Sequence, residues 1–312
     1  MTIIADKVRR LAPYVLIFGL LGAVYLLPPD TSLGEVRKAG VLRACMPPSY
    51  PPLVTGDRDA PGIDVEMLQA LAKNLGVSLI IASIPAIGQD FNPRNWHVTR
   101  AQCEVLGGGV VASPLTKSFL ETTAPYAQTG WALVGPKLPA DLQGRRVGVL
   151  TGVSGLDRLA LSSYLRARNA ELTVTADVAE FVEGLRAGRF EVGITEWLLA
   201  GQLAAGNGWS VAWMPAELPR YPVALGLWKG DLTLKRAIAD GLEKLRRDGE
   251  VARIIARYLG ARAKSDAARS IPSEMILFAQ NRTCEHVIGR REQSGDPSGG
   301  GQDCNQHSGE RS

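Results

Sequence analysis

The stretch LGEVRKAGVLRACMPPSYPPL at residues 33–53 combines a short amphipathic segment, an apolar run of strand length and a proline-rich turn. The apolar run, residues 41–46, ends at two consecutive prolines, which lack the N–H donor that a sheet ladder needs. Further on, residues 62–75 (GIDVEMLQALAKNL) place apolar side chains at the 3.6-residue period of an amphipathic helix, and Gly76 closes it. This order predicts a unit that starts with a short helix at residues 33–38 and continues with a strand, a loop and a second helix.

The same alternation continues along the chain. Further strands are expected at 77–82, 103–106, 129–134, 147–150, 171–175, 190–194 and 223–228, and further helices at 156–168, 178–187, 232–247 and 251–259. Alternating strands and helices predict an α/β fold with two lobes, each a mainly parallel sheet flanked by helices. Ligands of such folds bind beyond the carboxyl ends of the strands.

Composition and charge exclude several function classes. The chain has 312 residues, of which 46% are hydrophobic and 21% charged, the balance of a globular protein. The formal net charge is +4, and the basic residues form no patch interleaved with aromatics, which argues against nucleic-acid binding. His97 is the only histidine between residues 33 and 262, so we expect no metal site, no cofactor and no histidine-assisted hydrolase.

Both ends of the chain differ from this globular part. Residues 1–10 are basic and residues 11–29 (LAPYVLIFGLLGAVYLLPP) carry no charge, the order of a signal peptide or signal anchor. A bilayer takes roughly 17–25 apolar residues to span, and we favour an anchor that holds a periplasmic protein on the inner membrane. The Gly/Ser/Pro-rich composition of residues 294–302 predicts a disordered tail.

The resulting domain prediction has four parts. Residues 1–32 form the export segment, residues 33–131 plus 224–262 form lobe one, residues 132–223 form lobe two, and residues 263–312 form the tail. Lobe one is therefore discontinuous in sequence.

Six stretches, in this order and spacing, resemble the family 3 extracellular solute-binding proteins. They are residues 33–53, 62–77, 113–134, 141–155, 185–196 and 245–260. The resemblance implies two lobes joined by two crossing segments, near 131–134 and 222–225, that close on a small polar solute. It further implies an amino acid or related ligand, an ABC transporter permease as partner and no catalytic group.

The resemblance also implies roles for single residues. Tyr50 stands where an aromatic side chain covers the ligand, and Leu150 where an apolar residue faces it across the cleft. Ser154, beside Gly152 at a helix start, matches the turn that binds the ligand carboxylate. Glu196 stands where the family usually has the aspartate that takes the ligand ammonium.

The chain departs from the family at the carboxylate-binding arginine of lobe one. Thr116 fills that position, and Lys117 follows it. An arginine holds a carboxylate with two parallel hydrogen bonds, whereas a lysine one position further round a helix is a point charge aimed elsewhere. We keep both residues as candidate ligand contacts, together with Gly109, which suits close approach of a ligand. An α-amino acid would lose its main clamp on lobe one.

Two alternative functions stay open. Some relatives that assist a periplasmic quinoprotein dehydrogenase have cysteines where this chain has Cys45 and Cys103, so a dehydrogenase is a second candidate partner. Periplasmic dehydratases share the fold, and Glu196 would then be a general acid. Export favours a disulfide between the two cysteines. However, Cys45 ends one expected strand and Cys103 begins another, which would separate them along the sheet, so their pairing is left open.

Overall fold

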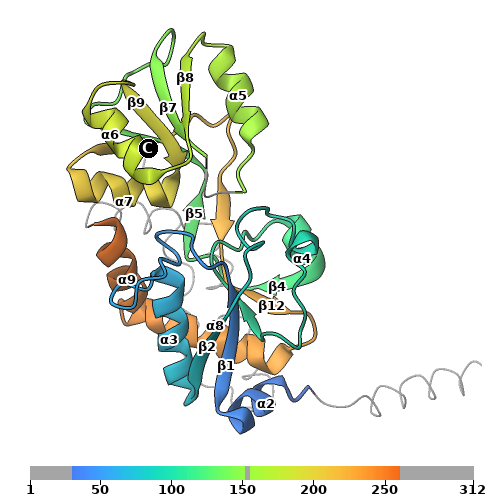
Figure 1. Ribbon diagram of the computed structural model, residues 1–312. Coiled ribbons are helices and arrows are strands. Elements are labelled where there is room, and N and C mark those ends of the chain that lie inside the picture. The colour runs from blue at the N-terminus through green and yellow to red at the C-terminus, as the bar shows by residue number, and fades with distance from the viewer. Residues whose placement is uncertain (1–29, 152–154, 261–312) are drawn as a thin grey trace, which may run out of the picture. The chain divides into compact units, whose positions relative to one another are not determined.

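Two five-stranded sheets and a two-stranded ribbon organise residues 30–151 and 155–260, the part of the chain that the computed structural model describes (Figure 1). The strands are β1 (Val41–Met46), β2 (Ser78–Ser83), β3 (Val105–Leu106), β4 (Leu120–Thr122), β5 (Ala127–Thr129), β6 (Trp131–Gly135), β7 (Arg146–Leu150), β8 (Glu171–Thr175), β9 (Val192–Glu196), β10 (Ser210–Trp213), β11 (Tyr221–Val223) and β12 (Gly226–Trp228). The helices are α2 (Ser32–Ala39), α3 (Ile63–Leu75), the 3₁₀-helix η1 (Pro93–Trp96), α4 (Pro114–Phe119), α5 (Arg158–Arg166), α6 (Val178–Arg186), α7 (Trp197–Asn207), α8 (Leu232–Arg247) and α9 (Glu250–Leu259).

The helices with the clearest periodicity form where the sequence predicts them. In α3 the apolar face is buried, and Gly76 ends the helix in the left-handed conformation at φ 74°. Helix α8 spans the predicted residues 232–247, and its buried side chains recur at the spacing of one helix face. Helix α7 is not among the predicted helices.

Both sheets are mixed, whereas the sequence predicts mainly parallel ones. In the first sheet, of order β2-β1-β3-β12-β4, β1 is parallel to both neighbours and β12 antiparallel to both of its own. In the second, of order β10-β6-β9-β7-β8, β7 is parallel to its neighbours and β6 antiparallel. The antiparallel strands β6 and β12 each follow a strand of the ribbon. We call the part of the fold built on the first sheet the first half, and the part built on the second sheet the second half. The chain reaches β6 from the first half and β12 from the second half.

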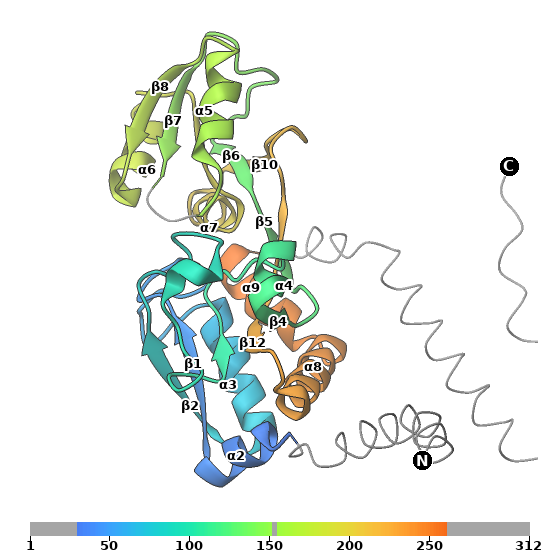
Figure 2. The same ribbon diagram turned by 90° about the vertical axis from the view of Figure 1, so that its right-hand side faces the viewer.

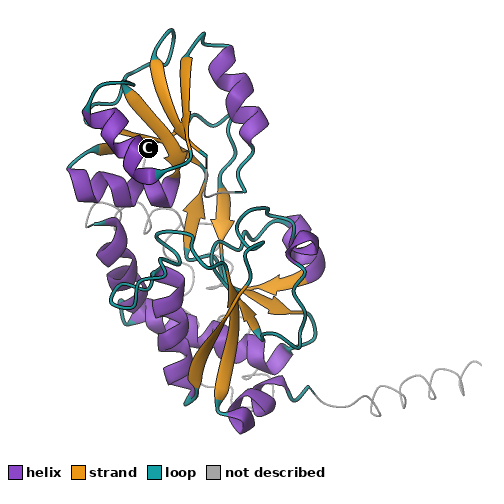
Figure 3. Ribbon diagram, in the orientation of Figure 1, coloured by secondary structure: helices purple, strands orange, loops and turns teal. Residues whose placement is uncertain are grey.

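The ribbon of β5 and β11 runs between the two larger sheets (Figure 3). The expected single strands at 129–134 and 223–228 are each divided in two, one part in the ribbon and one in a sheet. Helices flank both sheets: α3 and α8 pack together beside the first, and α5 and α6 lie on the second (Figure 2). This arrangement confirms the α/β fold.

Cys45 and Cys103 form a disulfide with a Cα–Cα distance of 5.6 Å, and both are fully buried. The separation along the sheet that the strand prediction implies is therefore wrong. Strand β3 begins only at Val105, and a bend at Glu104 turns Cys103 out of the line of that strand. The Trp228 indole donates to the Cys103 carbonyl at 2.7 Å and holds it there.

The predicted export segment and tail cannot be compared with the fold, because residues 1–29 and 261–312 lie outside the described part of the chain. Within residues 30–151 and 155–260, no helix is both long and apolar enough to cross a membrane.

Candidate functional site

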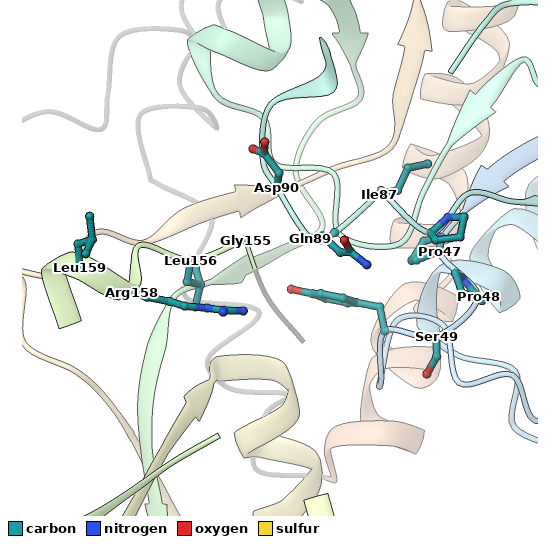
Figure 4. A pocket seen from close by; sticks show the side chains of 13 residues that line it. Pro47, Pro48, Ser49, Ile87, Gln89, Asp90, Gly155, Leu156, Arg158 and Leu159 are labelled. Carbon is teal, nitrogen blue, oxygen red and sulfur yellow. The ribbon is translucent and has the colours of Figure 1, made fainter. Parts of the chain in front are cut away.

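A cavity of about 710 Å³ opens where three loops meet beyond the carboxyl ends of parallel strands (Figure 4). One loop follows β1, the second follows β2, and the third precedes α5 after β7. The lining residues are Pro47, Pro48, Ser49, Tyr50, Pro85, Ile87, Gly88, Gln89, Asp90, Gly155, Leu156, Arg158 and Leu159. Both sheets thus contribute to one cavity, at the edge where ligands of α/β folds bind.

Tyr50 packs its ring against two glycines of the first half. A Cβ built on Gly109 would lie 3.2 Å from the ring, and one on Gly88 would lie 3.0 Å from it. Both glycines also have positive φ angles, which other residues rarely adopt. The structure therefore brings together Tyr50 and Gly109, two of the residues that the sequence analysis selects.

Arg158 and Gln89 are lining residues that the sequence analysis missed. Figure 4 shows the Arg158 side chain extending into the cavity from α5, and the Gln89 amide pointing into it from the loop after β2. One Arg158 nitrogen donates to the Thr151 carbonyl at 2.6 Å, which orients the guanidinium. A signal was available, because Arg158 lies in the first turn of a helix expected after a strand.

Asp90 also lines the cavity, but its carboxylate points away from the centre (Figure 4). It accepts hydrogen bonds from the Asn92 N–H at 2.7 Å and from the Asn95 side chain. Arg158 is therefore the charged group that the described residues present to the cavity.

Glu196 ends β9 and caps α7. Its carboxylate accepts hydrogen bonds from the Leu199 N–H at 2.9 Å and from the Thr129 hydroxyl. Only 2% of the residue is exposed, and this burial raises its pKa to about 7. Both oxygens already have donors from the chain itself, and the predicted ammonium contact remains a prediction.

A second buried carboxyl, Asp64, was also missed. Asp64 lies in the first turn of α3. Its carboxylate accepts hydrogen bonds from the Gly108 N–H at 2.6 Å and from the Tyr126 hydroxyl. The first of these bonds holds the loop of residues 107–109 beside Tyr50. Burial raises its pKa to about 6. Burial raises the pKa of Tyr50 well above its usual value, and the negative charges of Glu196 and Asp64 raise it further.

The other predicted contacts lie elsewhere or cannot be placed. Thr116 is fully buried in α4, with its hydroxyl 3.1 Å from that of Ser113, and Lys117 is exposed on the same helix. Leu150 packs into the apolar core of the second half. None of these three lines the cavity. Gly152 and Ser154 lie outside the described residues.

Thr175, at the carboxyl end of β8, carries a buried hydroxyl without a hydrogen-bond partner, the single such side-chain atom in the described part of the chain. Its carbonyl accepts from the Thr151 N–H at 3.2 Å, so it lies beside the residue that Arg158 contacts. Buried polar groups are normally satisfied, and an exception calls for an explanation.

The family model of the bacterial extracellular solute-binding proteins, family 3, matches residues 42–261 of this chain. The L-cystine-binding protein TcyJ of Escherichia coli K12 is 26% identical over 245 residues, which cover 73% of this chain and 86% of TcyJ. Membrane-bound lytic murein transglycosylase F of Pseudomonas syringae pv. syringae is 29% identical over 263 residues, covering 78% of this chain and 49% of the transglycosylase.

Solved structures show the same two-lobed fold. The ancestral cationic amino acid solute binding protein AncCDT-1 superposes with a TM-score of 0.60 at 22% identity, covering 73% of this chain and 99% of that one. An amino acid ABC transporter substrate-binding protein from Streptococcus pneumoniae bound to L-arginine gives a TM-score of 0.53 at 22% identity, covering 73% and 97%.

Proposed function

Since the chain belongs to the bacterial extracellular solute-binding proteins of family 3, we propose that it closes two lobes on a small polar solute, an amino acid or related compound, for delivery to an ABC transporter. The observation that carries this proposal is the cavity of about 710 Å³ lined by loops from both sheets. The proposal places the protein in the periplasm, with residues 1–32 as its export segment or inner-membrane anchor.

Closure follows from where the lining residues originate. Tyr50 belongs to the first half and Arg158 to the second, and the ribbon of β5 and β11 joins the halves. A solute that touches both side chains binds the closed form more tightly than the open form, and therefore shifts the equilibrium between them. No catalytic group is needed for that shift. We take residues 33–131 plus 224–262 as lobe one and residues 132–223 as lobe two.

The named relatives support the ligand class. TcyJ binds L-cystine, and the streptococcal protein is bound to L-arginine. In this chain we assign Tyr50 as the aromatic side chain that covers the solute, and Gly109 as the position where the solute approaches the backbone closely. Gly152 and Ser154, which precede α5, are our candidates for contacts to an anionic group of the solute.

Calorimetric titration of the purified full-length chain with a panel of amino acids and related acids tests this function. We expect micromolar binding without turnover, and a loss of at least about tenfold in affinity for Tyr50→Ala, because a buried aromatic contact is worth more than about 1.4 kcal/mol. Tyr164→Ala is the matched control, because Tyr164 packs under Arg168 and does not line the cavity.

Two other outcomes would contradict the proposal. Product formation that is lost in Glu196→Gln would make the protein a dehydratase-like enzyme. If no solute of the panel binds and a quinoprotein dehydrogenase copurifies with the chain, the protein would be an accessory protein of that enzyme.

A further inference from the structure

We propose that Phe91 is a latch between the two halves, that is, a side chain carried by the first half that docks on the second half and holds the two together around a bound solute. Phe91 is not among the residues that line the cavity, so it is a positioning residue that acts through closure. The effect on solute binding rests on the proposed function, whereas the contact between the halves does not.

The loop that carries Phe91 is fixed to the first half on both sides of that residue. Ile87 before it and Trp96 after it are each 1% exposed, and both belong to the buried apolar cluster that contains the disulfide. The Trp96 indole donates to the carbonyl of Asp90, directly before Phe91, at 2.7 Å. Phe91 therefore moves with the first half.

The ring of Phe91 meets the second half and the ribbon. It lies edge-on to the Tyr221 ring of β11, with the ring centroids 5.3 Å apart, a favourable aromatic arrangement. A Cβ built on Gly155 would lie 2.9 Å from the Phe91 ring and 3.1 Å from its backbone nitrogen. The ring also packs against the apolar cluster of the second half that contains Trp131 and Leu156. One side chain of the first half is thus part of the apolar packing of the second.

This contact lies beside the cavity. Gln89 and Asp90, directly before Phe91, line the cavity from the first half, and Gly155 and Leu156 line it from the second (Figure 4). Separating the halves would open the cavity and withdraw the Phe91 ring from Gly155 in the same movement. Because apolar and aromatic contacts would be lost, the latch favours the closed form over the open form.

Hydrogen–deuterium exchange of the unliganded full-length chain, followed by mass spectrometry, tests the latch without a solute. We expect Phe91→Ala to speed exchange about fivefold or more in both facing segments, residues 84–92 and 155–161, because the halves separate more often. A local packing defect would speed it in residues 84–92 alone. Phe119→Ala is the matched control, because Phe119 is a partly exposed ring of α4 that contacts Arg94 within the first half. It should leave residues 155–161 unchanged.

Gly155→Ala probes the same contact from the second half, because the added methyl group would overlap the Phe91 ring. Alone, it should speed exchange in residues 84–92. In the Phe91→Ala background the same substitution should have little further effect, because the smaller side chain leaves room for the methyl group. This double-mutant cycle isolates the pair, and additive effects would show that the two residues do not act together.

With a solute, the latch should act on the rate of release. L-cystine and L-arginine, the solutes named for TcyJ and the streptococcal protein, are the first probes, followed by the rest of the amino-acid panel. For a solute that binds, Phe91→Ala should raise the dissociation rate about tenfold, the equivalent of about 1.4 kcal/mol, because release requires opening. It should not lower the association rate, because the open form admits the solute.

The possible results distinguish failure of the latch from failure of the proposed function. Faster exchange confined to residues 84–92, or an unchanged dissociation rate in Phe91→Ala, would overturn the latch and leave a solute-binding protein in place. Faster exchange in both segments without binding of any solute would support the contact between the halves and overturn the proposed function. If Phe91→Ala loses its cooperative unfolding transition, Phe91→Leu replaces it, with changes in the same direction and of smaller size.

Discussion

At the residue scale, Glu196 joins three segments of chain. It ends β9, caps α7 through the Leu199 N–H, and accepts the hydroxyl of Thr129 from β5. Its pKa is raised to about 7, and that of Asp64 to about 6, in both cases chiefly by burial. Folding therefore takes up protons at both carboxyls near neutral pH, which makes the stability of the protein depend on pH.

We expect the free energy of unfolding to fall as the pH rises from about 4 to about 7. In this window the folded state binds more protons than the unfolded chain, so the stabilisation is complete below the unfolded pKa and is lost as the pH passes the folded pKa. For Glu196 the loss is on the order of 3 kcal/mol, from a shift from 4.5 to about 7 at about 1.4 kcal/mol per pH unit. Urea denaturation measured across this range checks the slope.

The variant Glu196→Gln should flatten this dependence, because an amide does not titrate and is close in shape. Glu183→Gln replaces an exposed glutamate of α6 and should leave the slope as it is in the unaltered chain. An equal slope in all three proteins would show that Glu196 does not titrate in this window.

At the element scale, α6 packs closely on the second sheet because glycines leave room for aromatic rings. A Cβ built on Gly193 of β9 would lie 2.3 Å from the Phe181 ring of α6. Gly206 in α7 has a different role, because a Cβ there would meet no atom within 4 Å. Gly193 is therefore needed for side-chain packing, whereas Gly206 matters only through the conformational freedom of its backbone.

Replacing each glycine with alanine should have opposite effects. Gly193→Ala should lower the free energy of unfolding by about 1–3 kcal/mol, because the added methyl group overlaps Phe181 in a close-packed core. Gly206→Ala should raise it by up to about 1 kcal/mol, because alanine restricts the unfolded chain and favours a helix. Urea denaturation of both variants measures the two effects, and a stabilised Gly193→Ala would contradict the close packing of α6.

At the scale of the whole molecule, the first sheet is completed only after the chain has made the second. Strand β12 lies between β3 and β4 and pairs with both, although more than a hundred residues separate it from either. Helices α8 and α9 then pack on α3 and extend the core of the first half. The first sheet is therefore incomplete until β12, near the end of the described chain, has joined β3 to β4.

A chain truncated after Leu225 should therefore fail to fold its first half. It lacks β12 and the helices that cover α3, so β3 and β4 lose their shared neighbour. A chain truncated after Gly260 keeps every described element and should retain the cooperative transition and the ligand affinity of the full chain. Thermal unfolding followed by circular dichroism distinguishes the two, and a cooperative transition of full size in the shorter chain would contradict the coupling.

Local patterns in the sequence determined the strongly amphipathic helices, the alternation of strands with helices and the family resemblance, which the family match over residues 42–261 confirms. These depend on side-chain period and turn residues within a few positions of one another. Helix α7 escaped the pattern because WLLAGQLAAGN is apolar on nearly all sides and shows no face.

Only the tertiary structure decided which distant residues meet. It joined Cys45 to Cys103 through a bend, reversed β6 and β12 by routing the chain through the ribbon, and engaged the carboxylate of Glu196 as a helix cap. It also placed Arg158 in the cavity and left Thr116 out of it. The physical reason is that hydrogen bonds and ion pairs act over a few ångströms, and a cavity forms only where its lining residues lie close together in space. The residues that meet here are tens of positions apart in the sequence.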